Sequence, residues 1–458
     1  MSLGIWENID HFNFNEFACV KKGFLRYEKG EMSISRDKES QLLLKVIGDA
    51  TVSDFNFKDK EGDIPYEDFH VEFKHNHLDQ KIKMLAVPIN RKITQNNGEH
   101  IYIDIFLVEE FEFSDDHSLI GAEYLIEFVD NLKINHLFPN SMQIKENHEK
   151  IYDLKDSNFE LMQKIINHNH WSRNNIRFEL EDSEIFIIKL GNGDKGIILY
   201  NMELGLVKRE KIRNTISYIL GSPLVFYGYS FVNKYMAPTF SYLRNINSNE
   251  LGRLSIDFQL PAPLSLKAFN IIELDFFQKL VQEFYIKYDE YDLNNIFFTY
   301  WIAVNSNSIT AAVHYGALIE KLQANYMKIN NVSYSKILDK STFKKLSEQL
   351  KVQLDSFELS DAHKEIFINK IGNMNTYSQK DMMNFFCKDI SLELSEIEKK
   401  AWQQRNDAAH GNDVSDVNKA WRNTLILREL VNKFLLKLLT SSKHYFSYVE
   451  GNTETKRL

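Results

Sequence analysis

The stretch "FQLPAPLSLK", residues 258–267, marks the point at which the character of the sequence changes. Pro261 and Pro263 stand two residues apart, and a proline lacks the backbone N–H that interior positions of helices and sheets donate. Such a pair is typical of a connection between structural units. We therefore predict a linker over residues 261–265, with differently folded parts on its two sides.

Before the linker, the pattern is typical of β structure. "EDFHVEFKHNH" (67–77) alternates apolar and polar residues as a half-buried strand does. Asn97-Gly98 is the commonest hairpin signal, since both turn residues need positive φ. "GNGDKG" (191–196) resembles a phosphate-binding fingerprint, but "IILY" follows it, and that fingerprint needs a helix there. We expect a hairpin turn at this place.

These patterns predict a β-rich N-terminal lobe over residues 1–146. A second β-rich lobe with helical insertions is predicted over 147–260, unless both belong to one large sandwich or barrel. Within it, residues 147–171 look helical.

After the linker, apolar residues recur with the 3.6-residue period of amphipathic helices. Residues 266–445 contain about six such segments: 270–288, 306–328, 341–357, 361–371, 391–410 and 416–442. We expect the last helix to run from about Asp416 to Thr440. We predict an all-helical domain over residues 266–458 that resembles a bundle. The fold class is therefore α+β, with a β-rich N-terminal region followed by a helical bundle.

Composition and charge restrict the possible functions. The net charge of −9 argues against a surface that attracts nucleic acid everywhere, so an RNA substrate would need a local basic site. The two cysteines, Cys19 and Cys387, fit no metal or redox spacing and read as reduced thiols. No apolar run is long enough to span a membrane, and no signal peptide is recognisable. We expect a cytoplasmic protein without a membrane partner.

Two His-x-His pairs, His75/His77 and His168/His170, are candidates for a metal site. Residues two apart on a strand share a face, so either pair could hold a metal ion from one side. Neither pair has a cysteine or a carboxylate cluster nearby, so exposed polar positions are the preferred interpretation. A metal-dependent nuclease would need all four histidines to meet in space.

The candidate active site is "RNDAAHG", residues 405–411. We expect its helix to bury a stripe at steps of three and four: Leu394, Ile397, Ala401, Gln404 and Ala408. Arg405 falls on the flank of that stripe, and Asn406 and His410 share a face. Arg405 and His410 lie about 140° apart around a helix, so one straight helix does not direct both at one atom. Both residues could also be structural, with His410 near the negative end of the helix dipole.

An arginine, a polar residue and a histidine in this spacing, before a long final helix, resemble the motif of HEPN ribonucleases. With its β-rich N-terminal region, the chain resembles the Apea-like HEPN (RxxxxH) family of bacterial anti-phage defence proteins. The resemblance implies catalytic roles for Arg405, Asn406 and His410. Asp407 could support His410 by holding its imidazole, or could form only a salt bridge at the surface. It implies RNA cleavage by 2′-OH attack, with no metal and no cofactor.

The resemblance also implies a homodimer formed through the HEPN domain, which would unite two copies of the motif in one cleft. Lys399, Lys400 and Arg422 are candidates for RNA binding, or simply lie on a solvated face. The N-terminal region would respond to a phage-derived trigger. The alternative is a non-catalytic HEPN-like module that binds a nucleotide or a protein.

Overall fold

The chain forms two compact units, Met1–Gln282 and Glu283–Leu458. The computed structural model describes residues 11–14, 16–21, 31–37, 41–49, 69–96, 99–115, 121–132, 138–147, 149–154, 160–163, 172–190, 194–201, 204–246, 272–332, 336–409, 416–447, 449 and 454–458. The predicted linker, residues 261–265, lies outside them. The domain boundaries predicted at residues 146 and 260 stay predictions.

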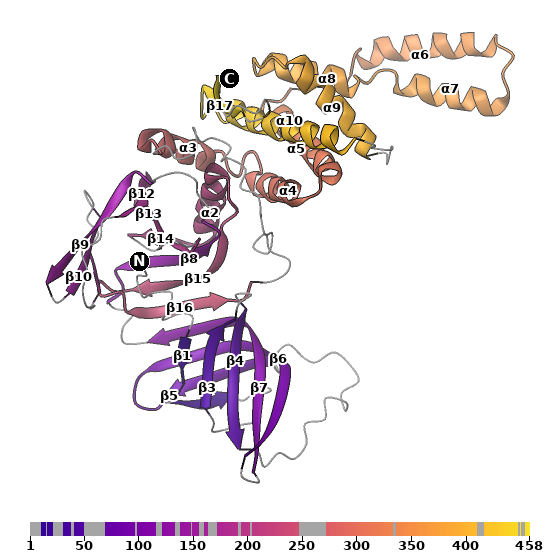
Figure 1. Cartoon of the computed structure of the whole chain (residues 1–458). Helices are drawn as coiled ribbons and strands as arrows, with labels where there is room; N and C mark the ends of the chain where they lie inside the picture. The colour runs from indigo at the N-terminus through magenta and orange to yellow at the C-terminus, as the bar shows by residue number, and fades with distance from the viewer. Residues whose placement is uncertain are drawn as a thin grey trace. The chain divides into compact units, whose positions relative to one another are not determined.

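The first unit is built on a sheet of sixteen strands (Figure 1). The strands are β1 (His11–Asn13), β2 (Phe17–Lys21), β3 (Glu31–Arg36), β4 (Leu42–Asp49), β5 (His70–His75), β6 (Gln80–Asn96), β7 (Glu99–Asp115), β8 (Tyr124–Asp130), β9 (Asn140–Asn147), β10 (Glu149–Leu154), β11 (Glu160–Gln163), β12 (Ser172–Leu180), β13 (Ser183–Lys189), β14 (Gly196–Tyr200), β15 (Val225–Val232) and β16 (Pro238–Arg244). The main path runs β1-β3-β4-β7-β16-β15-β8-β14-β13-β12-β9-β10-β11.

The two predicted hairpins are confirmed by strand pairing. β6 and β7 are antiparallel, with Asn96 opposite Glu99, as expected for two strands of one hairpin. β13 and β14 are antiparallel, with Lys189 opposite Gly196, so a strand follows "GNGDKG" rather than a helix. Residues 97–98 and 191–193 themselves lie outside the described residues.

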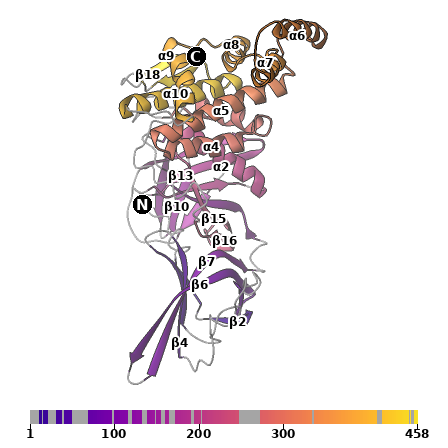
Figure 2. The same ribbon diagram turned by 90° about the vertical axis from the view of Figure 1, so that its right-hand side faces the viewer.

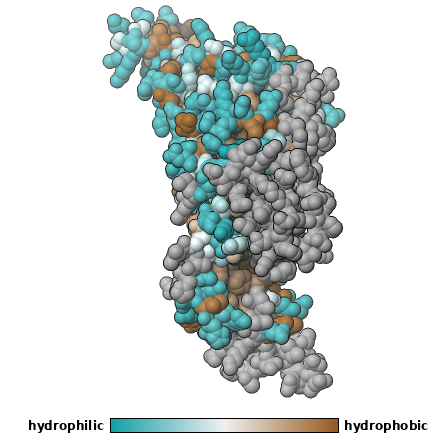
Figure 3. Space-filling model, turned by 90° about the vertical axis from the view of Figure 1, so that its left-hand side faces the viewer, coloured by the Kyte–Doolittle hydropathy of each residue, from teal (hydrophilic) through white to brown (hydrophobic). Residues whose placement is uncertain are grey.

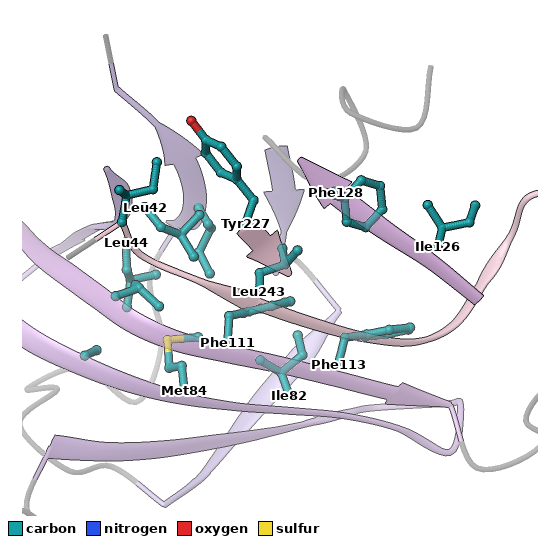
Figure 4. Close-up of a cluster of buried hydrophobic side chains, with 14 of the residues drawn as sticks. Leu42, Leu44, Ile82, Met84, Phe111, Phe113, Ile126, Phe128, Tyr227 and Leu243 are labelled. Atoms are coloured by element: carbon teal, nitrogen blue, oxygen red, sulfur yellow. The ribbon is translucent and has the colours of Figure 1, made fainter. Parts of the chain in front are cut away.

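Alternating side chains from these strands form the core of the first unit. Phe111 and Phe113 on β7 are buried, whereas Glu110 beside them is exposed. Figure 4 shows the buried cluster to which they belong, with contributions from β4, β6, β8, β15 and β16. On the face shown in Figure 3, hydrophilic residues dominate the described surface, with hydrophobic ones interspersed. The period of two therefore separates core from surface here.

The prediction of a helix over residues 147–171 is wrong for the residues that the structure describes there. β9, β10 and β11 form a meander, with Tyr152 opposite Ile144 and Leu161. The segment has few β-branched residues, and its helical pattern is overridden by strand pairing. The helix of this region is instead α2 (Leu206–Leu220), which ends at Gly221 with φ 74°.

A buried ionic cluster joins α2 to the sheet. Glu127 on β8 is fully buried, and both its oxygens accept hydrogen bonds from Nη1 of Arg213 at 2.9 Å. Arg209, one turn earlier on α2, donates to Glu127 at 3.2 Å, and the Tyr200 hydroxyl donates at 3.1 Å. Arginines four apart share one helix face, so α2 can direct both guanidinium groups at one carboxylate.

Eight helices lie in the described helical region: α3 (Leu274–Ile286), α4 (Leu293–Asn305), α5 (Ser308–Ile329), α6 (Lys340–Asp355), α7 (Asp361–Asn373), α8 (Gln379–Asp389), α9 (Glu396–Ala409) and α10 (Val417–Leu438). This confirms the α+β class with a β-rich N-terminal part. The predicted number of six was too low because α4 and α8 were missed. α4 is mostly apolar and has no clear polar face, and α8 has only 11 residues.

The second unit has α10 at its centre. α10 packs against α5 and α9, and α4 packs against α5 (Figure 2). A short hairpin of β17 (His444–Ser447) and β18 (Glu454–Arg457), absent from the prediction, follows α10. Among the described residues, no helix is both long and apolar enough to cross a membrane.

Candidate functional site

The candidate site is carried by α9, and the start of this helix is set by its own side chains. Ser395 Oγ accepts a hydrogen bond from the backbone N–H of Glu398 at 3.3 Å. In return, Oε2 of Glu398 accepts from the backbone N–H and from the hydroxyl of Ser395, both at 2.8 Å. This is a capping box, which satisfies N–H groups that would otherwise lack partners at the helix start. The sequence "SEIE" therefore determines where α9 begins.

The second carboxylate oxygen of Glu398 fixes α9 against α10. Nζ of Lys433 on α10 lies 2.7 Å from Oε1 of Glu398, and the side chains are only 8% and 9% exposed. The same ammonium group lies 4.7 Å from the centre of the Tyr445 ring. Each buried charge is thus compensated, as burial of charge requires. The pair positions the first turn of the helix that later carries the motif.

The buried face of α9 differs from the predicted stripe. Glu398, Ala401 and Trp402 are buried, whereas Ile397 is 48% exposed. The prediction assigned apolar residues to the core, but the buried pair of Glu398 with Lys433 turns the helix so that Ile397 faces outward.

The motif occupies the end of α9 and the connection to α10. The structure places the backbone of Arg405, Asn406 and Asp407 within α9, which ends at Ala409. His410 lies outside the described residues. α10 starts after Asp416, whose side chain accepts a hydrogen bond from the backbone N–H of Lys419 at 3.0 Å. The final helix therefore begins where it was predicted, at about Asp416, and the connection before it lies outside the described residues.

The three candidate RNA-binding residues lie on two helices. Lys399 Nζ lies 2.8 Å from Oε1 of Glu396, one turn earlier. This hydrogen bond raises the pKa of Lys399 and lowers the pKa of Glu396. Lys400 on α9 and Arg422 on α10 are exposed. The charge of Lys399 is thus partly balanced locally, and Lys400 and Arg422 are the better candidates of the three.

The polar residues that α10 buries were not predicted from the sequence. Arg428 is 2% exposed, and its Nε donates to the Tyr300 hydroxyl of α4 at 2.9 Å. Glu429 accepts a hydrogen bond from the Ser447 hydroxyl at 3.1 Å. The available signal was the interruption of "LILRELVNKFLLKLL" (425–439) by Arg428, Glu429, Asn432 and Lys433. Arg428, Glu429 and Lys433 connect α10 to α4, β17 and α9 and so hold the scaffold, rather than forming an exposed reactive group.

His75 does not lie in a site suited to a metal ion. Its Nε2 lies 2.7 Å from Oε2 of Glu16, and its Nδ1 accepts hydrogen bonds from the backbone N–H groups of His77 and Leu78. Since Nδ1 accepts, the proton resides on Nε2 and is donated to Glu16, so both ring nitrogens are used. His168 and His170 lie outside the described residues. Nowhere in the described part of the chain do three or more potential ligands gather around a metal position.

Comparisons with family models, with curated proteins and with solved structures all found no match for this chain. Assignment of a function therefore depends on the motif and on its position in the helical unit.

Proposed function

We propose that the helical unit is a metal-independent endoribonuclease of the HEPN type, in which Arg405, Asn406 and His410 are catalytic. The observation that carries this proposal is the position of Arg405 and Asn406 in the C-terminal part of α9, which precedes α10 in the chain. Support comes from the packing of both helices against each other and against α5. A motif at the junction of two packed helices rests on a rigid scaffold, as a catalytic group requires.

The chemistry suits these residue types. The 2′-oxygen of the substrate attacks the adjacent phosphorus, and the bond from phosphorus to the 5′-oxygen breaks. His410 accepts the proton of the 2′-hydroxyl, since an imidazole titrates near neutral pH. The leaving 5′-oxygen takes up a proton, so the products carry a 2′,3′-cyclic phosphate and a 5′-hydroxyl. Arg405 binds the phosphate oxygens on which negative charge develops.

The remaining residues assist in this proposal. Asn406 orients His410 or the phosphate through a hydrogen bond, and Asp407 holds the imidazole. Lys400 and Arg422 are exposed and would bind the phosphate backbone, with Lys399 as a weaker candidate. A homodimer joins two motifs in one cleft. In a cytoplasmic anti-phage role, the N-terminal region restrains cleavage until a phage-derived trigger arrives.

The experiment is cleavage of labelled RNA by the purified full-length chain in the presence of EDTA. We expect Arg405→Ala and His410→Ala to lower the rate by about a hundredfold or more, since each removes a group that acts in the transition state. Arg457→Ala and His444→Ala are matched controls, because they remove the same residue types from the C-terminal hairpin. These controls should cleave at the wild-type rate.

The products and the cellular effect complete the test. The RNA fragments should carry 2′,3′-cyclic phosphates, and DNA of the same sequence should stay intact because it lacks the nucleophile. In cells exposed to phage, only the variants that retain the motif should fragment RNA and protect the culture. The non-catalytic binding module would be favoured if the wild type binds RNA without cleaving it and if Arg405→Ala and His410→Ala bind RNA equally well.

A further inference from the structure

The α6–α7 hairpin (residues 336–376) extends away from the other helices of its unit (Figure 1). Its base is closed by Asn375, whose side chain accepts a hydrogen bond from the Leu338 N–H at 2.7 Å and donates to the Leu338 carbonyl at 2.9 Å. The two helices pack against each other. With 16 and 13 residues, they form a separate structural element with its own surface.

This hairpin exposes an unusual number of large apolar side chains. Only Ser347 and Ile371 of the two helices are buried. Val352 is 72% exposed and Phe357, in the turn, is 63% exposed. The consecutive residues 366–368 (Ile, Phe, Ile) are each at least 39% exposed. Three consecutive positions cover about 200° of a helix, so the one neighbouring helix does not cover them all. The apolar surface therefore suits a further packing partner.

The charges of the hairpin are separated along its length. The base, residues 336–347 and 368–376, contains five basic residues and one acidic residue: Lys336, Lys340, Lys344, Lys345, Lys370 and Asp339. The tip, residues 348–367, contains five acidic and two basic residues: Glu348, Asp355, Glu358, Asp361, Glu365, Lys351 and Lys364. The hairpin is therefore basic at its base and acidic at its tip.

We propose that the α6–α7 hairpin binds the same hairpin of a second copy of this chain. In an antiparallel arrangement about a two-fold axis, the acidic tip of each copy lies against the basic base of the other. Two hairpins then form a four-helix bundle, which buries apolar residues that a single hairpin leaves exposed. One surface serves both copies, as an isologous contact requires. The inference does not rest on the proposed ribonuclease activity.

The charge pattern permits a direct test by sedimentation velocity of the full-length chain. The base variant Lys340→Glu/Lys344→Glu/Lys345→Glu leaves two basic and four acidic residues at the base. The tip variant Glu348→Lys/Glu358→Lys/Glu365→Lys leaves two acidic and five basic residues at the tip. Each variant alone repels its own copy, whereas a mixture of the two restores opposite charges at both contacts.

We expect the wild type to dimerise, and each variant alone to dimerise at least about tenfold more weakly. An equimolar mixture should recover a dimer that contains one copy of each variant. Raising the salt concentration should weaken the wild-type dimer, since exposed charges are screened. The matched control is Lys380→Glu/Lys388→Glu/Lys443→Glu, which makes the same charge change at exposed positions outside the hairpin. This control should dimerise like the wild type.

Two results would overturn the inference. A wild type that stays monomeric at high concentration would leave the hairpin to a different partner. A dimer that neither triple variant weakens would place the contact elsewhere on the chain. Circular dichroism confirms that the variants keep their helices. RNA cleavage is a separate readout. If Arg405→Ala cleaves RNA at the wild-type rate while the dimer forms as described, the proposed function is contradicted and the inference about the hairpin stands.

Discussion

Lys433 and Glu398, 35 residues apart in the sequence, form an ion pair of 2.7 Å in the interior of the helical unit. The same glutamate also caps the start of α9 through Ser395. One side chain thus sets both where α9 begins and how it lies on α10. Because helices are stiff, a fixed first turn also determines where the motif at the other end of α9 is held. The pair therefore links the scaffold to the candidate site.

Replacing Lys433 with Met should destabilise the helical unit by about 3–5 kcal/mol, because the negative charge of Glu398 then remains buried without a counter-charge. Urea denaturation followed by circular dichroism measures the change. The double variant Lys433→Met/Glu398→Gln is the control, since it removes both charges and should recover a large part of the loss. Equal stability of Lys433→Met and wild type would mean that water reaches Glu398 and compensates its charge.

In the first unit, Glu127→Gln should lower the free energy of unfolding by about 3–5 kcal/mol, because the two buried guanidinium groups of Arg209 and Arg213 lose their common carboxylate. Denaturation of the full-length chain, followed by the near-ultraviolet signal of the β-rich unit, measures this. Lys208→Gln is the control: its bridge to Glu181 is half-exposed, so about 1 kcal/mol or less is expected. A smaller effect for Glu127→Gln than for Lys208→Gln would contradict a structural role for the cluster.

The change from strands up to β16 to helices from α3 onward was predictable because the hydrophobic period itself changes from about 2 to 3.6. Hairpins at Asn97-Gly98 and at "GNGDKG" were predictable from turn chemistry. α4 was missed because a helix that is apolar on most sides carries no amphipathic contrast. The strands β10 and β11 were missed because pairing with a neighbouring strand, rather than local preference, determines them.

For the candidate site, the helix and its motif could be predicted, but the burial of its faces could not. Ile397 looked like a core residue, and Lys433 looked like an interruption of an apolar helix. Only the spatial meeting of Lys433 with Glu398 explains why a charged position is buried and an isoleucine is exposed. Such a pairing leaves no local pattern in a single sequence.

The two cysteines should differ strongly in reactivity. Burial raises the pKa of Cys387 from an ordinary value of 9.0 to about 12, and the negative charge of Glu398 contributes to this increase. At pH 8 its thiolate fraction is therefore about a thousandfold smaller than that of an ordinary thiol, and only the thiolate reacts. In the Cys19→Ser variant, labelling with a disulfide reagent should be very slow in the native state and rapid in urea.

The reciprocal variant completes this test. Cys19 is partly exposed, so the single thiol of Cys387→Ser should be labelled much faster in the native state. Raising the pH moderately above 8, within the range where the native fold persists, should accelerate labelling of Cys387 because the thiolate fraction rises. Equal labelling rates for the two variants at pH 8 would show that Cys387 is accessible to solvent.

Gly228 on β15 is the position where a small substitution should be most disruptive. Its φ of +145° is unfavourable for other residues, and an added Cβ would lie 2.1 Å from the Tyr242 carbonyl oxygen on the neighbouring strand β16. The next nearest atom, the Cα of Leu243, would lie at 2.8 Å. Both atoms belong to the backbone of β16, which cannot move away without breaking its pairing with β15. We expect Gly228→Ala to destabilise the first unit by about 2 kcal/mol or more.

Gly372→Ala is the matched control for that substitution. Gly372 lies within α7, and an added Cβ there meets no atom within 4 Å. Alanine is the better helix former, so this variant should be neutral or more stable by up to about 1 kcal/mol. Urea denaturation of both variants measures the opposite effects. The opposite outcome would be a Gly228→Ala variant that unfolds at the same urea concentration as the wild type. The pairing of β15 at the irregularity between Phe226 and Gly228 would then tolerate a side chain, which contradicts the distances given above.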